Sequence, residues 1–303
     1  IVVRCFGKSD CLYPRIYDDI PYHEIEDYID VINKKSIEKA VIIINDISFL
    51  RKCKSLRYIS VTPSHQSGPN FDFSPLYDLP EVLSLSCRSR YGKKEEYISN
   101  IDYSKVKGLI DLGLEVTKGT INYNKVDKLK SLYISGFTGK NKDLTDLFCS
   151  EQLDTLQMIQ CGIVSLNGIG ISQKMQCLYL YYNRSLCDIS ELRSVKNTIK
   201  AIRIENCPKI KDFSVLGEME NLQLLQLDGK NELPNLGFLK TLKNLKTLDI
   251  SMNVLDGDLS LCKNLSFVRI RNRKHYNLKD KDMPKGKYVN GNEDIEMWRR
   301  TGM

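Results

Sequence analysis

Histidines are few in this chain and long apolar runs are absent. Both features reduce the range of functions that the sequence can support. The 303 residues include three histidines, His23, His65 and His275, which lie far apart in the sequence. None has a partner at the spacing of a metal site or a catalytic triad. No apolar run reaches the roughly 18 residues that a membrane-spanning helix needs. The longest run, 40–44, has the length of one strand.

A complete phosphate-binding loop is also missing. Gly168 and Gly170 follow an apolar segment, but neither a third glycine nor a helical pattern comes after them, so we predict a turn there. Gly139 and Lys140 have no upstream glycine at the P-loop spacing. No pair of carboxylates stands out for acid and base chemistry. We therefore predict no catalytic residue, no metal, no cofactor and no enzymatic activity.

The ten cysteines do not form the pattern of a small disulfide-linked domain. No C-x-x-C pair occurs, and several cysteines fall within or next to apolar segments. This spacing favours free thiols in the reducing cytosol over disulfides. Cys5 and Cys11 are the exception, since they lie close together near the start and could pair.

One pattern of apolar residues returns along most of the chain. Leu245, Leu248, Ile250 and Asn253 follow the order L-x-x-L-x-L-x-x-N. Further copies are Ile37/Ala40/Ile42/Asn45, Met175/Leu178/Leu180/Asn183, Leu153/Leu156/Met158/Cys161, Ile199/Ile202/Ile204/Cys207, Leu56/Ile59/Val61, Leu129/Leu132/Ile134, Leu222/Leu225/Leu227 and Leu265/Val268/Ile270. With two less regular copies described below, the second apolar positions are 19 to 26 residues apart. About eleven copies with this period predict a repeat protein.

Two copies are less regular than the others. One begins with a proline and reads Pro80/Leu83/Leu85. The other centres on Val106 and Leu109, and its third apolar position would be Asp111. Either the register slips there or the strand is irregular.

Each copy is too small to bury its own apolar side chains, so copies must stack into a continuous core. Alternation of apolar and polar residues in the L-x-L part predicts a strand with one buried face. The closing Asn can bond to backbone groups in the turn that leaves the strand. Cys207 and Cys161 replace it in two copies, and because a thiol is a weak donor we expect those turns to be held less firmly.

A second recurring sequence motif lies between the predicted strands. It opens with an acidic or amide residue followed by a short apolar stretch, at 72–76, 188–192, 212–216 and 235–239. Side chains such as Asp and Asn cap the first backbone N–H groups of a helical turn. We therefore predict short capped turns on the side opposite the strands.

These features together resemble the leucine-rich-repeat family, in particular the short-repeat type of bacterial internalins. The resemblance covers about 37–273. It implies an α/β repeat solenoid, a horseshoe with a parallel concave β-sheet and 3₁₀ helices, short helices or loops on the convex side. The same division gives an N-terminal cap at 1–36 and a C-terminal cap and polar tail at 274–303.

The two ends depart from the repeat pattern. Ile25, Tyr28, Ile29 and Ile32 follow helical spacing, so we predict a short amphipathic helix that covers the first repeat. At the other end we expect order up to about Asp282 and little beyond, although the single tryptophan, 298, could cover the last repeat.

Outward-pointing strand residues on the concave face form the candidate partner-binding site. Tyrosines dominate its earlier part and charges of both signs its later part. The candidates are Tyr133, Gln157, Tyr179, Tyr181, Arg203, Glu205, Gln226, Asp228, Asp249, Arg269 and Arg271. Tyr and Arg are enriched in the parts of protein interfaces that contribute most affinity, so this composition favours a protein partner.

Nucleic acid is the rival partner, because the net charge is +7 and Arg269, Arg271, Arg273 and Lys274 form a basic end. Acidic residues on the same face would repel a phosphate backbone, which disfavours nucleic acid as the partner.

We expect a monomeric cytoplasmic bacterial protein of the immunity or inhibitor kind, which covers a toxin or enzyme domain. An internalin-like adhesin, secreted or on the cell surface after loss of its signal, is the alternative.

Overall fold

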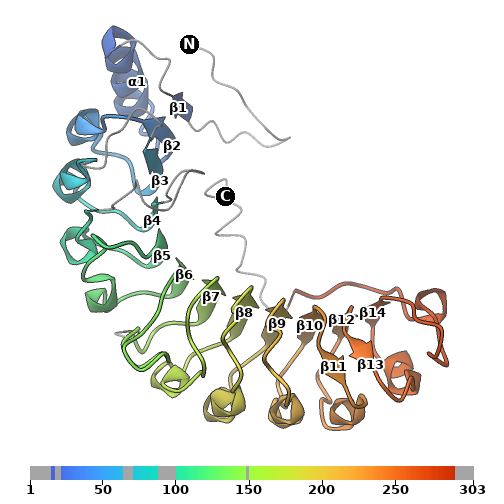
Figure 1. Cartoon of the computed structure of the whole chain (residues 1–303). Helices are drawn as coiled ribbons and strands as arrows, with labels where there is room; N and C mark the ends of the chain where they lie inside the picture. Colours follow the sequence, from blue (N-terminus) through green and yellow to red (C-terminus); the bar gives the residue numbers. More distant parts are fainter. Residues whose placement is uncertain (1–14, 18–21, 64–70, 88–99, 148–149, 291–303) are drawn as a thin grey trace. The chain divides into compact units, whose positions relative to one another are not determined.

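Residues 15–17, 22–63, 71–87, 100–147 and 150–290 are described by the computed structural model, as parallel strands joined by short 3₁₀ helices (Figure 1). They fall into two compact units, one ending at Leu129 and the other beginning at Lys130. Cys5, Cys11, His65 and the single tryptophan, 298, lie outside the described residues. No helix of the described ranges is both long and apolar enough to cross a membrane.

The first unit contains a parallel sheet in the order β1-β2-β3-β4-β5. Its elements are β1 (Arg15–Tyr17), α1 (Tyr22–Lys34), β2 (Lys39–Ile44), η1 (Ser48–Lys52), β3 (Tyr58–Pro63), η2 (Ser74–Asp78), β4 (Ser84–Cys87), η3 (Tyr103–Lys105), β5 (Asp111–Glu115) and η4 (Tyr123–Lys125), where η marks a 3₁₀ helix. The sheet therefore begins with β1, a strand that the repeat pattern does not predict.

Helix α1 packs against the first repeat through the apolar stripe of its sequence. Ile25, Tyr28, Ile29 and Ile32 are buried. At its end, the Asn33 side chain donates a hydrogen bond of 2.9 Å to the Lys52 carbonyl. Packing of this short helix removes the apolar stripe from water, as the spacing predicts.

The two irregular copies have a different register from the one read in the sequence. Leu85 pairs with Ile59 of β3 and with Leu112 of β5. Leu85 is therefore the second apolar position, and the copies are Val82/Leu85/Cys87 and Leu109/Leu112/Leu114. The Pro80/Leu83/Leu85 reading is wrong by two residues, and Leu109 is a first rather than a second position.

The second unit contains a parallel sheet in the order β6-β7-β8-β9-β10-β12-β14 and a two-stranded sheet β11-β13. Its elements are β6 (Ser131–Ser135), β7 (Thr155–Ile159), η5 (Ile169–Ile171), β8 (Cys177–Tyr181), η6 (Ser190–Val195), β9 (Ala201–Glu205), η7 (Ser214–Glu218), β10 (Leu224–Asp228), β11 (Glu232–Leu233), η8 (Gly237–Lys240), β12 (Thr247–Ile250), β13 (Asn253–Val254), η9 (Ser260–Asn264), β14 (Phe267–Ile270) and η10 (Asp280–Asp282). Within this unit the main sheet lies on the inner side of the stack and η5 to η9 on the outer side (Figure 1).

The core of the second unit lies between its sheet and its 3₁₀ helices. In β8, Leu178 and Leu180 are fully buried, and Ile202 and Ile204 of β9 stack beside them. Burial of each such side chain contributes about 1.5–3 kcal/mol. The L-x-L alternation therefore points one side of each strand into a continuous column and leaves the other side for a surface.

The predicted Asn position has the expected role at Asn183. Its Oδ1 accepts a 2.8 Å hydrogen bond from the Cys161 backbone N–H, and its Nδ2 donates a hydrogen bond of 3.2 Å to the Met158 carbonyl. Asn45 is exposed and so does not have this role. After β10, the position belongs instead to Asn231, whose Nδ2 donates hydrogen bonds to the Cys207 and Ile210 carbonyls.

The capped turns form as their sequence predicts. The side chains of Asp72, Asp188, Asp212 and Asn235 each accept a hydrogen bond of 2.7 to 2.8 Å from the backbone N–H two residues later. Each such bond satisfies an N–H group at the start of a 3₁₀ helix, η2, η6, η7 and η8 respectively. The turn predicted at Gly168 is the start of η5, where this residue has φ +96°.

The chain after β14 is ordered beyond the point that the sequence suggests. Residues 284–286 run antiparallel to β14, with the Val268 N–H bonded to the Pro284 carbonyl and the Gly286 N–H to the Ser266 carbonyl. This pairing covers the edge of the sheet, which would otherwise carry unpaired backbone groups. The expectation of little order after Asp282 is therefore wrong for residues 283–290.

Candidate functional site

The outward side chains of the second unit form rows because the strands pair in register. A central row runs across the sheet, one residue from each strand. It consists of Tyr133, Gln157, Tyr179, Arg203, Gln226, Asp249 and Arg269. Neighbouring strands lie about 4.8 Å apart, so each side chain is within reach of the next one in its row.

A second row lies two residues further along the same strands. It includes Tyr181, Glu205 and Asp228, which pair across β8, β9 and β10. Arg271 follows β14 directly and is exposed. The fold therefore brings all eleven predicted residues to one face of the second unit, which we call the sheet face. Tyr58, Ser60, Ser84 and Ser86 lie on β3 and β4 of the first unit.

The centre of the sheet face is built from Arg203 and two tyrosines. The Arg203 guanidinium carbon lies 5.2 Å from the Tyr179 ring centroid, a cation–π contact. Tyr179 is only 4% exposed, and its hydroxyl has the weakly bonding Cys177 thiol beside it. Burial raises the pKa of Tyr179 and of Tyr181, so both hydroxyls are neutral at physiological pH.

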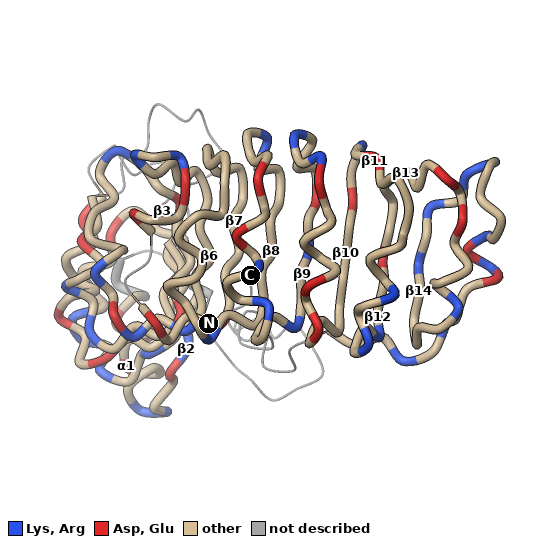
Figure 2. Tube along the Cα trace, turned by 90° about the horizontal axis from the view of Figure 1, so that it is seen from below, with Lys and Arg blue, Asp and Glu red and all other residues tan. Residues whose placement is uncertain are grey.

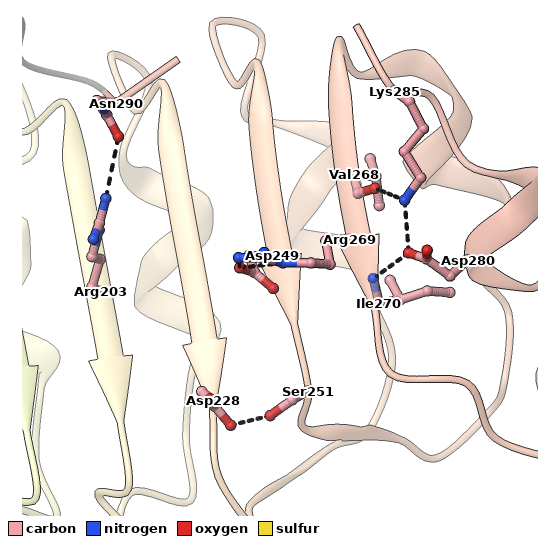
Figure 3. A network of polar contacts seen from close by, with 10 residues as sticks. All are labelled: Arg203, Asp228, Asp249, Ser251, Val268, Arg269, Ile270, Asp280, Lys285 and Asn290. Atoms are coloured by element: carbon pink, nitrogen blue, oxygen red, sulfur yellow. Dashed lines mark hydrogen bonds and ion pairs between the residues drawn. The ribbon is translucent and has the colours of Figure 1, made fainter. Parts of the chain in front are cut away.

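Asp228, Asp249 and Arg269 on the later strands already have partners within the second unit (Figure 3). Arg269 Nε donates a hydrogen bond of 2.9 Å to Asp249 Oδ2, and its Nη2 contacts the same oxygen. The Asp228 carboxylate accepts a hydrogen bond from the Ser251 hydroxyl. The face therefore carries groups of both charge signs at defined positions. Such a face favours a partner with a matching pattern of charges over a partner that carries charge of one sign.

The C-terminal residues 284–290, which we call the strap, run from the edge of the sheet beside β14 onto this face. The Val289 N–H donates a hydrogen bond of 2.9 Å to Thr247 Oγ1. The Tyr288 ring packs edge-on against the Phe267 ring, with ring centroids 5.2 Å apart. Asn290 Oδ1 accepts a long hydrogen bond of 3.4 Å from Arg203 Nη2 (Figure 3). Sequence reasoning missed the strap, because its only signal is one aromatic residue in a polar segment.

The basic end has more structural roles than the sequence suggests. Arg269 is paired with Asp249, and Arg273 Nη2 donates to the Ser251 carbonyl at 3.3 Å. In Figure 2, Lys and Arg alternate with Asp and Glu through the repeats of the second unit. His275 bonds through Nε2 to the Val254 carbonyl at 2.9 Å and so helps hold the C-terminal cap. These contacts leave the basic end without a continuous row of free cations.

Comparison with known proteins supports the fold. No protein-family model matches the chain, and no curated protein matches it in sequence. Among solved structures, an internalin (inlF) from Listeria monocytogenes aligns with a TM-score of 0.54 and 18% identity over 86% of this chain and 76% of that one. A leucine-rich-repeat protein from Leptospira interrogans aligns over 76% of each chain with 14% identity, at a TM-score of 0.40. The first similarity shows a leucine-rich-repeat solenoid.

Proposed function

We propose that this leucine-rich-repeat solenoid is a non-catalytic protein-binding scaffold, and that the sheet face of its second unit holds the partner. The observation that carries the proposal is the central row. It places Arg203 at the middle of the face, with the buried Tyr179 ring against its guanidinium, and an Asp249–Arg269 pair toward its end. Tyrosine and arginine at the centre of an interface are the residues that contribute most affinity.

The partner that we propose is a toxin or enzyme domain, and the mechanism is occlusion. A broad sheet face covers a surface without needing chemistry of its own, so it can block an active site by shape and charge. Exposed Arg269 and Arg271 at one end would select the partner's charge, while the half-buried Tyr133 and Tyr181 supply contact area. An immunity or inhibitor protein of a bacterial cytoplasm, monomeric until it binds its target, fits this arrangement.

The cysteines support a reducing compartment over the adhesin alternative. Among the described residues, seven cysteines are free and six of these are buried. Cys161 and Cys207 occupy the position that Asn183 has in its own repeat and donate weak hydrogen bonds to buried carbonyls. A thiol in such a site contributes packing and a weak bond without needing oxidation.

The test is capture of partners from lysate of the native host with the wild-type chain beside a Tyr179→Ala/Tyr181→Ala/Arg203→Ala variant. Because Tyr179 is buried, an Arg271→Glu variant, changed at an exposed position that breaks no ion pair of the described residues, tests the same face with little effect on packing. Lys211→Ala/Lys240→Ala, at exposed sites outside the sheet, is the matched control.

We expect one protein to be retained by the wild-type and control chains and lost from both sheet-face variants. Equal retention by all four chains would contradict the assignment of the partner to the sheet face. Recovery of nucleic acid that is released at high salt would favour nucleic acid as the partner.

A further inference from the structure

Arg203 is a partly buried cation that forms no ion pair with any described residue. The other central-row cation, Arg269, is paired with Asp249. Arg203 Nε is buried and has no hydrogen-bond partner in the described part of the chain. A buried donor without an acceptor costs about 1–3 kcal/mol, so natural proteins rarely keep one without a reason.

Among the described residues, the groups that contact the Arg203 side chain are neutral. The Tyr179 ring lies against the guanidinium, and the Tyr181 hydroxyl lies close to it. Asn290 of the strap supplies an amide oxygen at 3.4 Å, longer than an ordinary hydrogen bond. Two aromatic neighbours also exclude water, and an ionic hydrogen bond formed in such a place is stronger than one in bulk solvent.

We propose that Arg203 binds a carboxylate of the protein partner, an aspartate or glutamate side chain, at the position where Asn290 Oδ1 now lies. This inference rests on the proposed function, since it names the chemical group that the sheet face recognises. Asn290 then acts as a neutral substitute for that carboxylate in the free protein. A polyanion fits this position less well, because Glu205 and Asp228 in the adjacent row would repel its further charges.

The first test needs no partner, because Asn290→Asp puts a carboxylate at this position within the chain itself. We expect the apparent melting temperature at neutral pH to rise by roughly 2 °C in the wild-type background. In an Arg203→Gln background, which keeps polar contacts but removes the charge, the gain should vanish. Asn264→Asp, at an exposed position away from Arg203, is the matched control and should give no gain in either background.

A spectroscopic readout separates an ion pair from a general effect of charge. In the ¹⁵N-arginine-labelled full chain, the Nε–H resonance of Arg203, assigned by its loss in Arg203→Gln, should shift in Asn290→Asp and stay unchanged in Asn264→Asp. The proposal is overturned if Asn290→Asp changes the melting temperature equally in both Arg203 backgrounds and leaves this resonance unmoved.

The second test separates this inference from the proposed function. Asn290→Asp should reduce partner capture several-fold, because its carboxylate competes for Arg203, whereas Asn290→Ala should not reduce it. If Asn290→Asp couples to Arg203 but capture stays unchanged, the partner does not bind a carboxylate there and the inference is wrong. If the sheet-face variants lose the partner while Asn290→Asp shows no coupling, the proposed function stands and only the inference fails.

Discussion

The side chain of Asn183 bridges two repeats by bonding to the backbone of Cys161. Its Oδ1 accepts the Cys161 N–H at 2.8 Å while its Nδ2 donates to the Met158 carbonyl, and Asn183 itself is fully buried. One amide thus satisfies a donor and an acceptor of the preceding turn that water does not reach. This contact explains in physical terms why the repeat closes with an amide.

Replacement of Asn183 should therefore be among the most damaging changes in the second unit. We expect Asn183→Ala to lower the free energy of unfolding by about 2–4 kcal/mol, because two buried backbone groups lose their partner. Cys161→Ala, which removes a thiol that makes only weak bonds, should cost clearly less. Urea denaturation of both variants measures the difference, and equal losses would contradict the bridging role.

The capping aspartates predict how stability depends on pH. Hydrogen bonds from Ser190 and Ser214 lower the pKa of Asp188 and Asp212 below the ordinary value of 3.8. A carboxylate with a lowered pKa in the folded state contributes stability above its unfolded pKa, and the contribution is lost as the pH falls through the folded one. Stability should thus fall below about pH 4.

The matched variant is Asp188→Asn/Asp212→Asn, which keeps an acceptor as Asn235 does in its own repeat. Its melting temperature should fall less between about pH 6 and pH 3 than that of the wild type. An identical fall in both proteins would show that these caps do not contribute to the pH dependence.

Thiol reactivity should distinguish one cysteine from the rest. Burial raises the pKa of Cys161 and Cys207 to about 11 and that of Cys262 to about 12. Cys187 is exposed. In a variant with serine at positions 5, 11 and 149, we expect one thiol to react rapidly with a chromogenic disulfide in the native state and the other six only after unfolding. Loss of the rapid phase in an added Cys187→Ser change is the control.

The edge of the sheet should depend on Asp280 and Lys285. Asp280 Oδ1 accepts hydrogen bonds from the Ile270 N–H at 2.9 Å and from Lys285 Nζ at 2.8 Å, and Lys285 also donates to the Val268 carbonyl. Asp280→Ala should speed amide hydrogen exchange at Ile270 at least tenfold, because this edge N–H loses its acceptor. Lys281→Ala, at a neighbouring exposed position, should leave exchange unchanged. Unchanged exchange in Asp280→Ala would mean that the backbone alone protects this edge.

The regular repeats were predictable from sequence because their positions are set locally. Alternation along each strand determines which side faces the core, and Asp72, Asp188, Asp212 and Asn235 cap their turns through the backbone N–H two residues later. For the same reason, the residues of the sheet face could be chosen without a structure. Leu178 and Tyr179 lie on opposite sides of β8 because adjacent strand residues point to opposite sides.

Register in β4 and β5 was decided only by the tertiary structure. The second apolar positions Ile59, Leu85 and Leu112 are 26 and 27 residues apart, so several leucines could occupy each position and only pairing with neighbouring strands selects one. The exposure of Asn45 and the role of Asn231 follow from turns whose geometry a linear pattern does not contain.

The sequence likewise did not predict which charged residues of the sheet face are paired with one another. Asp249 pairs with Arg269 because β12 and β14 place them in the same row. Arg203 meets Asn290 across 87 positions of the chain, through a strap that carries no repeat signal. The sequence by itself therefore determined the repeat and the residues on its surface, since these depend on local periodicity. Tertiary structure alone decided which of those residues already have partners, because that depends on segments far apart in the chain.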